Sequence, residues 1–146
     1  METNDILAEV VVELYLEKDN KVLLQKRANT NYEDGKYGFI GGHVAKGETL
    51  KQALIREVKE EAGITIDENK LDCVYIANKT GKKNCINFVF KTNEFEGVPQ
   101  IMEKDKCTDL RWFQPNQLPE NIIKLERQVI QGQNNSSINV NEFKLL

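Results

Sequence analysis

The sequence predicts an α/β fold in which a mixed β-sheet lies between helices. Short runs rich in β-branched and aromatic residues occur on both sides of one central helical segment, and a second helical segment follows near the end of the chain. The 146 residues are 40% hydrophobic and 29% charged, as is usual for a globular chain, and no linker, repeat or low-complexity tract divides them. We therefore expect a single domain over residues 1–146.

The first two strands are expected to form a hairpin. Residues 8–17, AEVVVELYLE, and residues 21–27, KVLLQKR, are both rich in strand-forming side chains. Asp19 and Asn20 lie between them and are residue types that favour a tight turn. The two strands should therefore pair directly with each other.

The central segment, residues 50–62, has the composition and the two ends of a helix. Most of its residues are good helix formers. Thr49 and Gln52 fit a capping box, in which a hydroxyl and an amide satisfy backbone groups of the first turn. Gly63 can adopt the left-handed conformation that ends a helix.

After this helix we expect further strands, a second helix and a short terminal segment. The tail after Gly132, QNNSSINVNEFKLL, begins with polar residues that indicate a flexible connection. The strands are expected at residues 73–78, 85–92 and 109–113, and the helix from Pro119 to Gln131.

Three carboxylates gather near the end of the central helix. At 100° per residue, Glu57 and Glu61 fall on the same stripe as the apolar residues, and Glu60 lies beside them. Like charges three or four residues apart destabilise a helix by about 0.2–0.5 kcal/mol per pair, and partial burial adds to that cost. The apolar residues of the stripe are Leu50, Ala53, Leu54 and Val58.

A hard divalent cation would compensate this repulsion. Mg²⁺ and Mn²⁺ prefer oxygen ligands and are usually held by a few carboxylates together with water and substrate phosphates. Zinc fits poorly because His43 is the single histidine and no Cys-x-x-Cys pair exists. Gly41, Gly42 and Gly47 in the preceding loop allow close backbone approach, and the helix start presents N–H groups that attract anions.

These residues resemble the signature of the Nudix (MutT-like) hydrolases. The pattern is G-x5-E-x7-R-E-U-x-E-E-x-G-U, where U is a bulky aliphatic residue, and the chain fills it without exception. The matching residues are Gly42, Glu48, Arg56, Glu57, Val58, Glu60, Glu61, Gly63 and Ile64.

The resemblance implies a fold, a reaction and a set of site residues. The implied fold is an α/β/α sandwich, and the implied reaction is hydrolysis within the pyrophosphate of a nucleoside diphosphate linked to another moiety, with Mg²⁺ or Mn²⁺ bound. It also implies a further acidic ligand or base from a downstream loop, for which Glu103 is the candidate and Glu94, Glu96 and Asp105 are the local alternatives. The implied metal ligands are then Gly41, Glu57, Glu60, Glu61 and Glu103, and the catalytic residues are these glutamates with Arg56.

Three residues are candidates for binding the substrate. In related sequences a basic residue at the position of Arg27 often meets phosphate, and a guanidinium can pair bidentately with phosphate oxygens. Tyr32 and Phe88 are the aromatic residues that we expect to stack on a base. Arg56 is expected to orient Glu57 or Glu60 rather than to touch the substrate.

The composition of the chain limits the classes of binding partner that we expect. A net charge of −3 and a pI near 5.3 favour a nucleotide or another nucleoside-diphosphate-linked small molecule over a long nucleic acid. No apolar run is long enough to span a membrane and no signal pattern begins the chain, so we expect a cytoplasmic protein that contacts no membrane. The three cysteines, an odd number without short spacing, are expected to be reduced structural thiols. A homodimer is left open.

The substrate subclass is indicated only by absences. The chain has Ile40 instead of proline before the paired glycines, no proline-rich flank like that of NADH-cleaving members, and no proline near residue 80 as ADP-ribose-cleaving members tend to have. These absences favour free nucleoside tri- or diphosphates.

Two alternative functions remain open. One alternative is a catalytically silent nucleotide-binding sensor of the same fold, which would be expected to have lost glutamates of the signature. Another is prenyl diphosphate isomerisation, which would need a catalytic cysteine and further ligands that the sequence does not reveal.

Overall fold

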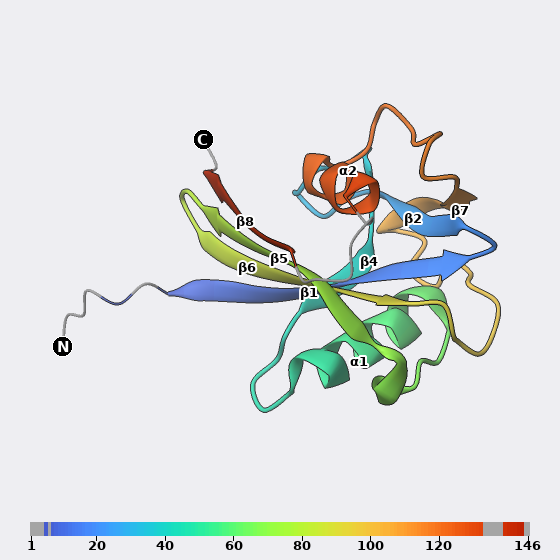
Figure 1. The fold of residues 1–146 in the computed structure, drawn as a ribbon, viewed down its shortest axis with the longest axis horizontal. Helices are drawn as coiled ribbons and strands as arrows, with labels where there is room; N and C mark the ends of the chain where they lie inside the picture. Colours follow the sequence, from blue (N-terminus) through green and yellow to red (C-terminus); the bar gives the residue numbers. More distant parts are fainter. Residues whose placement is uncertain (1–4, 6, 133–138, 145–146) are drawn as a thin grey trace.

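The computed structural model describes Asp5, residues 7–132 and the backbone of residues 139–144. An eight-stranded mixed sheet lies between α1 and α2 (Figure 1), which confirms the predicted α/β fold. The elements in chain order are β1 (Ala8–Lys18), β2 (Lys21–Arg27), β3 (Tyr37–Gly38), β4 (Ile40–His43), α1 (Leu50–Ala62), a 3₁₀ turn (Glu68–Lys70), β5 (Asp72–Thr80), β6 (Asn84–Thr92), β7 (Cys107–Phe113), α2 (Lys124–Gln131) and β8 (Asn139–Lys144).

Strand β1 is the centre of the sheet. The strand order is β3-β2-β1-β6-β5-β8, with β4 pairing with β1 and β7 pairing with β2. The pairs β1–β6 and β5–β8 are parallel and the other pairs are antiparallel. The predicted hairpin is confirmed, because Lys18 pairs with Lys21 across Asp19 and Asn20, whose φ angles of 52° and 61° suit a two-residue turn.

Helix α1 has the predicted bounds and the predicted caps. The Thr49 hydroxyl accepts a hydrogen bond from the Gln52 backbone N–H, and the Gln52 side chain accepts one from the Thr49 N–H, at 3.2 and 3.0 Å. Gly63 ends the helix in the left-handed conformation, with φ of 70°. The residues that α1 buries are Ala53, Leu54, Val58 and Ala62.

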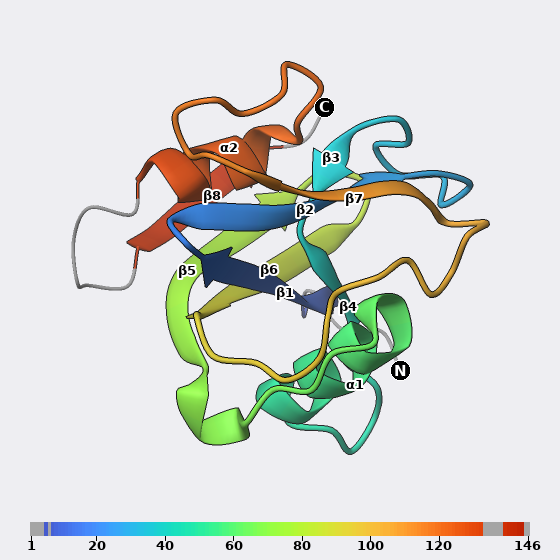
Figure 2. The same ribbon diagram turned by 90° about the vertical axis from the view of Figure 1, so that its right-hand side faces the viewer.

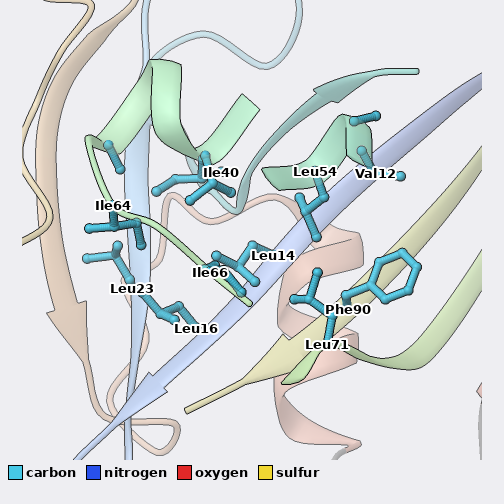
Figure 3. Close-up of a cluster of buried hydrophobic side chains, with 13 residues drawn as sticks. Val12, Leu14, Leu16, Leu23, Ile40, Leu54, Ile64, Ile66, Leu71 and Phe90 are labelled. Carbon is cyan, nitrogen blue, oxygen red and sulfur yellow. The ribbon is translucent and has the colours of Figure 1, made fainter. Parts of the chain in front are cut away.

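Two hydrophobic cores cover the two faces of the sheet. Alternate residues of β1 point to opposite faces, so Val12, Leu14 and Leu16 pack toward α1 (Figure 3), while Tyr15 packs toward α2. Glu13 lies between Val12 and Leu14 and therefore points to the α2 face. Because of this alternation, side chains at neighbouring positions of one strand lie on opposite faces of the sheet.

The second helix begins later than expected. Residues 119–123 were expected to be helical, but Tyr37 N–H donates to the Asn121 carbonyl at 2.8 Å and Ile123 N–H donates to the Tyr37 carbonyl at 3.0 Å. The backbone groups of this segment are therefore used in pairing with β3, and α2 starts only at Lys124. The expected start at Pro119 is wrong for this tertiary reason.

The short strands were not expected from the sequence. Strands β3 and β4 contain only two and four residues, too few to show a hydrophobic period. Strand β8 lies in the tail and pairs in parallel with β5, while the expected flexible connection falls on residues 133–138, outside the described residues.

No helix in the described part of the chain is both long enough and apolar enough to cross a membrane.

Candidate active site

The two glutamates on the apolar stripe are shielded from solvent. The side chain of Glu57 is 18% exposed, whereas that of Glu60 is 55% exposed. Burial raises the pKa of Glu57, Arg56 opposes that rise, and the charges of Glu60 and Glu103 add to it. Burial raises the pKa of Glu61 to about 8, and the charge of Glu57 contributes to the rise.

Arg56 connects the helix to the loop before it. Its guanidinium binds the Glu48 carboxylate through two hydrogen bonds of 2.6 and 2.8 Å, and it also donates to Glu57 at 2.9 Å. A longer bond of 3.5 Å reaches Glu60. Glu48 also accepts the Ala45 N–H at 2.8 Å, and Arg56 holds the pKa of Glu48 at about 2. Arg56 therefore fixes both the loop and the Glu57 carboxylate.

The paired glycines let strand β4 approach α1 closely. A Cβ atom at Gly42 would lie 2.4 Å from the carboxylate carbon of Glu57, and one at Gly41 would lie 2.0 Å from the Val12 carbonyl oxygen. Gly41 N–H donates to the Glu61 carboxylate at 3.1 Å. A side chain at Gly42 would therefore displace the Glu57 carboxylate, whereas one at Gly41 would push β4 away from β1.

The loop between β6 and β7 brings Glu103 to the same place. The N–H groups of Gln100 and Met102 donate to the carbonyls of Ala62 and Glu61 at 3.1 and 3.3 Å, so the loop runs along the end of α1 (Figure 2). Glu103 is close enough to raise the pKa of both Glu57 and Glu61. Its carboxylate forms a 3.7 Å ion pair with Lys106.

The donor set suits a hard cation. All its side-chain donors are carboxylate oxygens, which Mg²⁺ and Mn²⁺ prefer, and burial together with their mutual repulsion raises the pKa of Glu57 and Glu61. Within the described ranges, no three side chains of Asp, Glu, His or Cys lie close enough together to form a metal-binding group. Glu57 and Glu60 accept hydrogen bonds from Arg56 instead, and Glu61 accepts one from the Gly41 N–H. A cation would therefore bind by drawing these carboxylates together.

The expected substrate-binding residues lie on two faces of the sheet. Arg27 donates to the Tyr32 carbonyl at 2.9 Å and its guanidinium lies 5.3 Å from the centre of the Tyr32 ring. The Tyr32 hydroxyl accepts from Lys79 on the α2 side of the sheet, whereas Phe88 packs into the core beneath α1. Tyr32 and Phe88 are therefore not brought together and cannot stack on the same base in this arrangement.

Sequence reasoning missed a set of buried polar residues on the α2 side. Glu13, Lys79, Asn87 and Glu126 are all buried, and Asn87 donates to the Glu13 carboxylate. The available signal was the single charged residue inside the apolar run VVVELYL of β1. The structure also leaves His43 on the surface, 3.1 Å from Glu9, and Cys73, Cys85 and Cys107 as free thiols.

The chain is similar in sequence to known proteins. The model of the NUDIX domain matches residues 7–132. An ADP-ribose pyrophosphatase of Methanocaldococcus jannaschii is 34% identical over 112 residues, which cover 76% of this chain and 64% of the relative. A CTP pyrophosphohydrolase of Escherichia coli is 43% identical over 54 residues, which cover 37% of this chain and 40% of the relative. In each case the match spans less than two thirds of the relative.

Solved structures share the fold. The crystal structure of a MutT NUDIX hydrolase from Burkholderia pseudomallei superimposes with a TM-score of 0.80 at 25% identity, over 86% of this chain and 97% of that one. The solution structure of the E. coli ORF135 protein has a TM-score of 0.72 at 23% identity, over 90% and 91% of the two chains. With the family model matching most of its residues, the chain belongs to the Nudix family.

Proposed function

We propose that this protein is a metal-dependent pyrophosphohydrolase that cleaves a nucleoside diphosphate linked to another moiety, with a nucleoside tri- or diphosphate as its substrate. The observation that carries the proposal is the pair of shielded carboxylates, Glu57 and Glu61, beside the N–H of Gly41 and the incoming loop of Glu103. A globular protein does not usually shield two neighbouring carboxylates unless a cation or a proton compensates them. Family membership supports the same chemistry.

Nudix hydrolases generally need divalent metal ions. In this chain Mg²⁺ or Mn²⁺ would be held by Glu57, Glu60, Glu61 and Glu103 together with Gly41. A bound ion supplies charge neutralisation on the phosphates and an activated water for in-line attack on phosphorus.

The chain's own residues would then position the reactants. Arg56 holds the Glu57 carboxylate at a defined place, and Gly41 does the same for Glu61. Burial raises the pKa of Glu61, and the Arg27 guanidinium is near enough to oppose part of that rise, which favours Arg27 as the partner of a substrate phosphate. Glu103, on the docked loop and near both Glu57 and Glu61, would serve as a further ligand or base.

A nucleotide screen tests the proposal. The panel contains nucleoside tri- and diphosphates, dinucleotides and nucleotide sugars, and it includes ADP-ribose, CTP and 8-oxo-dGTP because relatives are named for them. We expect product with Mg²⁺ or Mn²⁺, none with EDTA, and none from Glu57→Gln. If the whole panel stays uncleaved with metal while nucleotides still bind, the protein is a nucleotide sensor instead.

A further inference from the structure

The loop after β2 and the loop before β7 are joined at their bases. Strand β2 pairs with β7 up to its last residue. Beyond that residue the Ala28 N–H donates to the Lys106 carbonyl at 2.9 Å. The side-chain amide of Asn29 then donates to the Asp105 carbonyl at 2.7 Å. A side chain therefore continues the pairing of the two segments, which lie side by side in Figure 2.

Glu103 lies in the same turn as these acceptors. The N–H groups of Lys106 and Cys107 donate to the Glu103 carbonyl at 3.0 and 3.1 Å, and the Glu103 carboxylate forms its ion pair with Lys106. On the other side of Glu103, the Met102 N–H donates to the Glu61 carbonyl at 3.3 Å, which ties the chain to α1. Glu103 is thus placed between two anchors, α1 before it and the loop after β2 behind it.

Asn29 is suited to the second anchor. Its φ of 55° lies in the left-handed region, which asparagine enters more readily than most residues. Its amide supplies the N–H that a carbonyl accepts, and the distance of 2.7 Å is at the short end of the usual range. Because the bond is exposed to water, its loss should have a moderate effect on the turn.

Asn29 also follows the residue that is expected to hold the substrate phosphate. The backbone of Arg27 closes the neck of the loop, because its carbonyl accepts the Gly35 N–H at 2.7 Å and its N–H donates to the Lys36 carbonyl at 2.9 Å. Only Ala28 separates Arg27 from Asn29. The candidate for phosphate binding and the anchor of the next loop are therefore parts of one short hydrogen-bonded segment.

We infer that Asn29 is a positioning residue that fixes Glu103 beside the carboxylates of α1. The inference rests on the proposed function, because that function makes Glu103 a metal ligand or base. Without the Asn29 amide, the turn keeps the Ala28 bond but loses the bond at Asp105, so Glu103 occupies its place for a smaller fraction of the time. Asn29 acts through Glu103 and does not itself touch the substrate.

Three variants separate the amide of Asn29 from its backbone conformation. Asn29→Gly keeps the left-handed backbone and removes the amide. Asn29→Asp keeps the shape of the side chain but sets a carboxylate oxygen against the Asp105 carbonyl oxygen, with no proton between them. Asn31→Gly is the matched control, because Asn31 lies in the same loop with φ of 63° and its loss leaves the bond to Asp105 in place.

Hydrogen exchange without metal measures how firmly the turn is held. The amides of Lys106 and Cys107, which donate to the Glu103 carbonyl, are followed by ¹⁵N–¹H NMR in EDTA. We expect exchange about fivefold faster in Asn29→Gly, the factor that corresponds to one neutral hydrogen bond. Exchange should be faster still in Asn29→Asp and unchanged in Asn31→Gly. Unchanged exchange in both Asn29 variants overturns the inference.

A double-mutant cycle links Asn29 to the Glu103 carboxylate. Turnover and Mn²⁺ affinity are measured for the parent, Asn29→Gly, Glu103→Ala and the double variant. Asn29→Gly should lower one of the two quantities about fivefold in the parent, and should cause no further loss once Glu103 is alanine. Asn29→Asp should lower the same quantity more, although its added negative charge would by itself favour a cation. Losses that add in full show a general role in folding of the loop and overturn the inference.

The inference and the proposed function fail on different results. If the parent cleaves no nucleotide with metal, the proposed function fails, and the Mn²⁺ cycle with hydrogen exchange still decides the role of Asn29. If nucleotides are cleaved but both Asn29 variants behave like Asn31→Gly, the function stands and the positioning role is refuted. If Glu103→Ala alone changes neither turnover nor Mn²⁺ affinity, the positioning role is refuted together with the assignment of Glu103.

Discussion

At the scale of a single residue, Glu61 shows how its position in the fold changes the pKa of a carboxyl group. Glu60 and Glu61 are neighbours in the chain, yet Glu60 is exposed, whereas burial and then the charge of Glu57 raise the pKa of Glu61 to about 8. The direction of this shift means that the metal-free protein keeps Glu61 protonated at neutral pH. A cation must displace that proton in order to bind.

Metal binding should therefore release a proton below about pH 8. The folded pKa is raised, so protonation competes with the cation at low pH, and the affinity for Mg²⁺ should increase as the pH rises from 6 to about 8 and then level off. Titration calorimetry in two buffers of different ionisation enthalpy counts the protons. Glu61→Gln should release none, and a parent protein with pH-independent affinity would contradict the assignment of Glu61.

At the scale of elements, the site depends on how closely β4 and the β6–β7 loop approach α1. The glycines of β4 and the hydrogen bonds of the loop to the last turn of α1 determine these distances. Each contact can be altered without touching a carboxylate of the helix. We therefore make one prediction for β4 and one for the loop between β6 and β7.

Gly42→Ala should displace the Glu57 carboxylate. Its Cβ would lie 2.4–2.7 Å from the carboxylate atoms, which is closer than nonbonded contacts allow. A misplacement of about 1 Å can reduce turnover by about 10²-fold, and we expect a loss of that order. Steady-state kinetics together with a melting curve measure it, and turnover within about twofold of the parent would show that Glu57 has room to move.

Glu103→Ala should weaken metal binding or slow the chemical step while the fold persists. Glu103 lies on a loop that is anchored by backbone groups of Gln100 and Met102, so the loss of its carboxylate does not release the loop. Lys106→Ala is the matched control, because it removes the ion-pair partner of Glu103 but no expected ligand. An unchanged metal titration and turnover in Glu103→Ala would exclude Glu103 from the site.

At the scale of the whole molecule, metal binding and folding should be linked. Because the proposed ligands come from α1 and from the loop before β7, a cation that binds them would stabilise the folded state by RT ln(1 + [L]/Kd), about 2.7 kcal/mol at a hundredfold excess over Kd. Mg²⁺ or Mn²⁺ should therefore raise the melting temperature. Residues 1–146 are expected to respond as one cooperative unit, since a single domain is predicted.

Glutamine at Glu57, Glu60 or Glu61 should separate activity from stability. Each change keeps the side-chain shape. The changes at Glu57 and Glu60 remove a repelling charge, and the change at Glu61 replaces a protonated carboxyl by a neutral amide, so the metal-free melting temperature should stay level or rise, while turnover falls by about 10²-fold or more. Glu68→Gln, on the exposed 3₁₀ turn, is the control. If all three variants remain as active as the parent and gain the same stability from metal, the carboxylates form a solvated surface and the cation binds elsewhere.

Elements whose signals are local can be predicted from the sequence. The hydrophobic pattern, the capping box of Thr49 and Gln52, and the stop at Gly63 predict α1 to the residue, and the spacing of the glutamates predicts which carboxylates are shielded. The turn at Asp19 and Asn20 follows in the same way from residues that accept a positive φ. These features depend on neighbours within one or two turns of chain.

Features that depend on partners distant in the sequence become visible only in the three-dimensional structure. The backbone of Tyr37 forms hydrogen bonds with the backbone of residues 121 and 123, so α2 begins only after them. The parallel pairing of β5 with β8 likewise leaves no local pattern in the sequence. Alternation along β6 places Phe88 under α1 and Asn87 on the opposite face, which parts Phe88 from Tyr32. The buried set of Glu13, Lys79 and Glu126 arises because three separate elements meet at one face, and long-range packing of this kind leaves no spacing in the sequence to read.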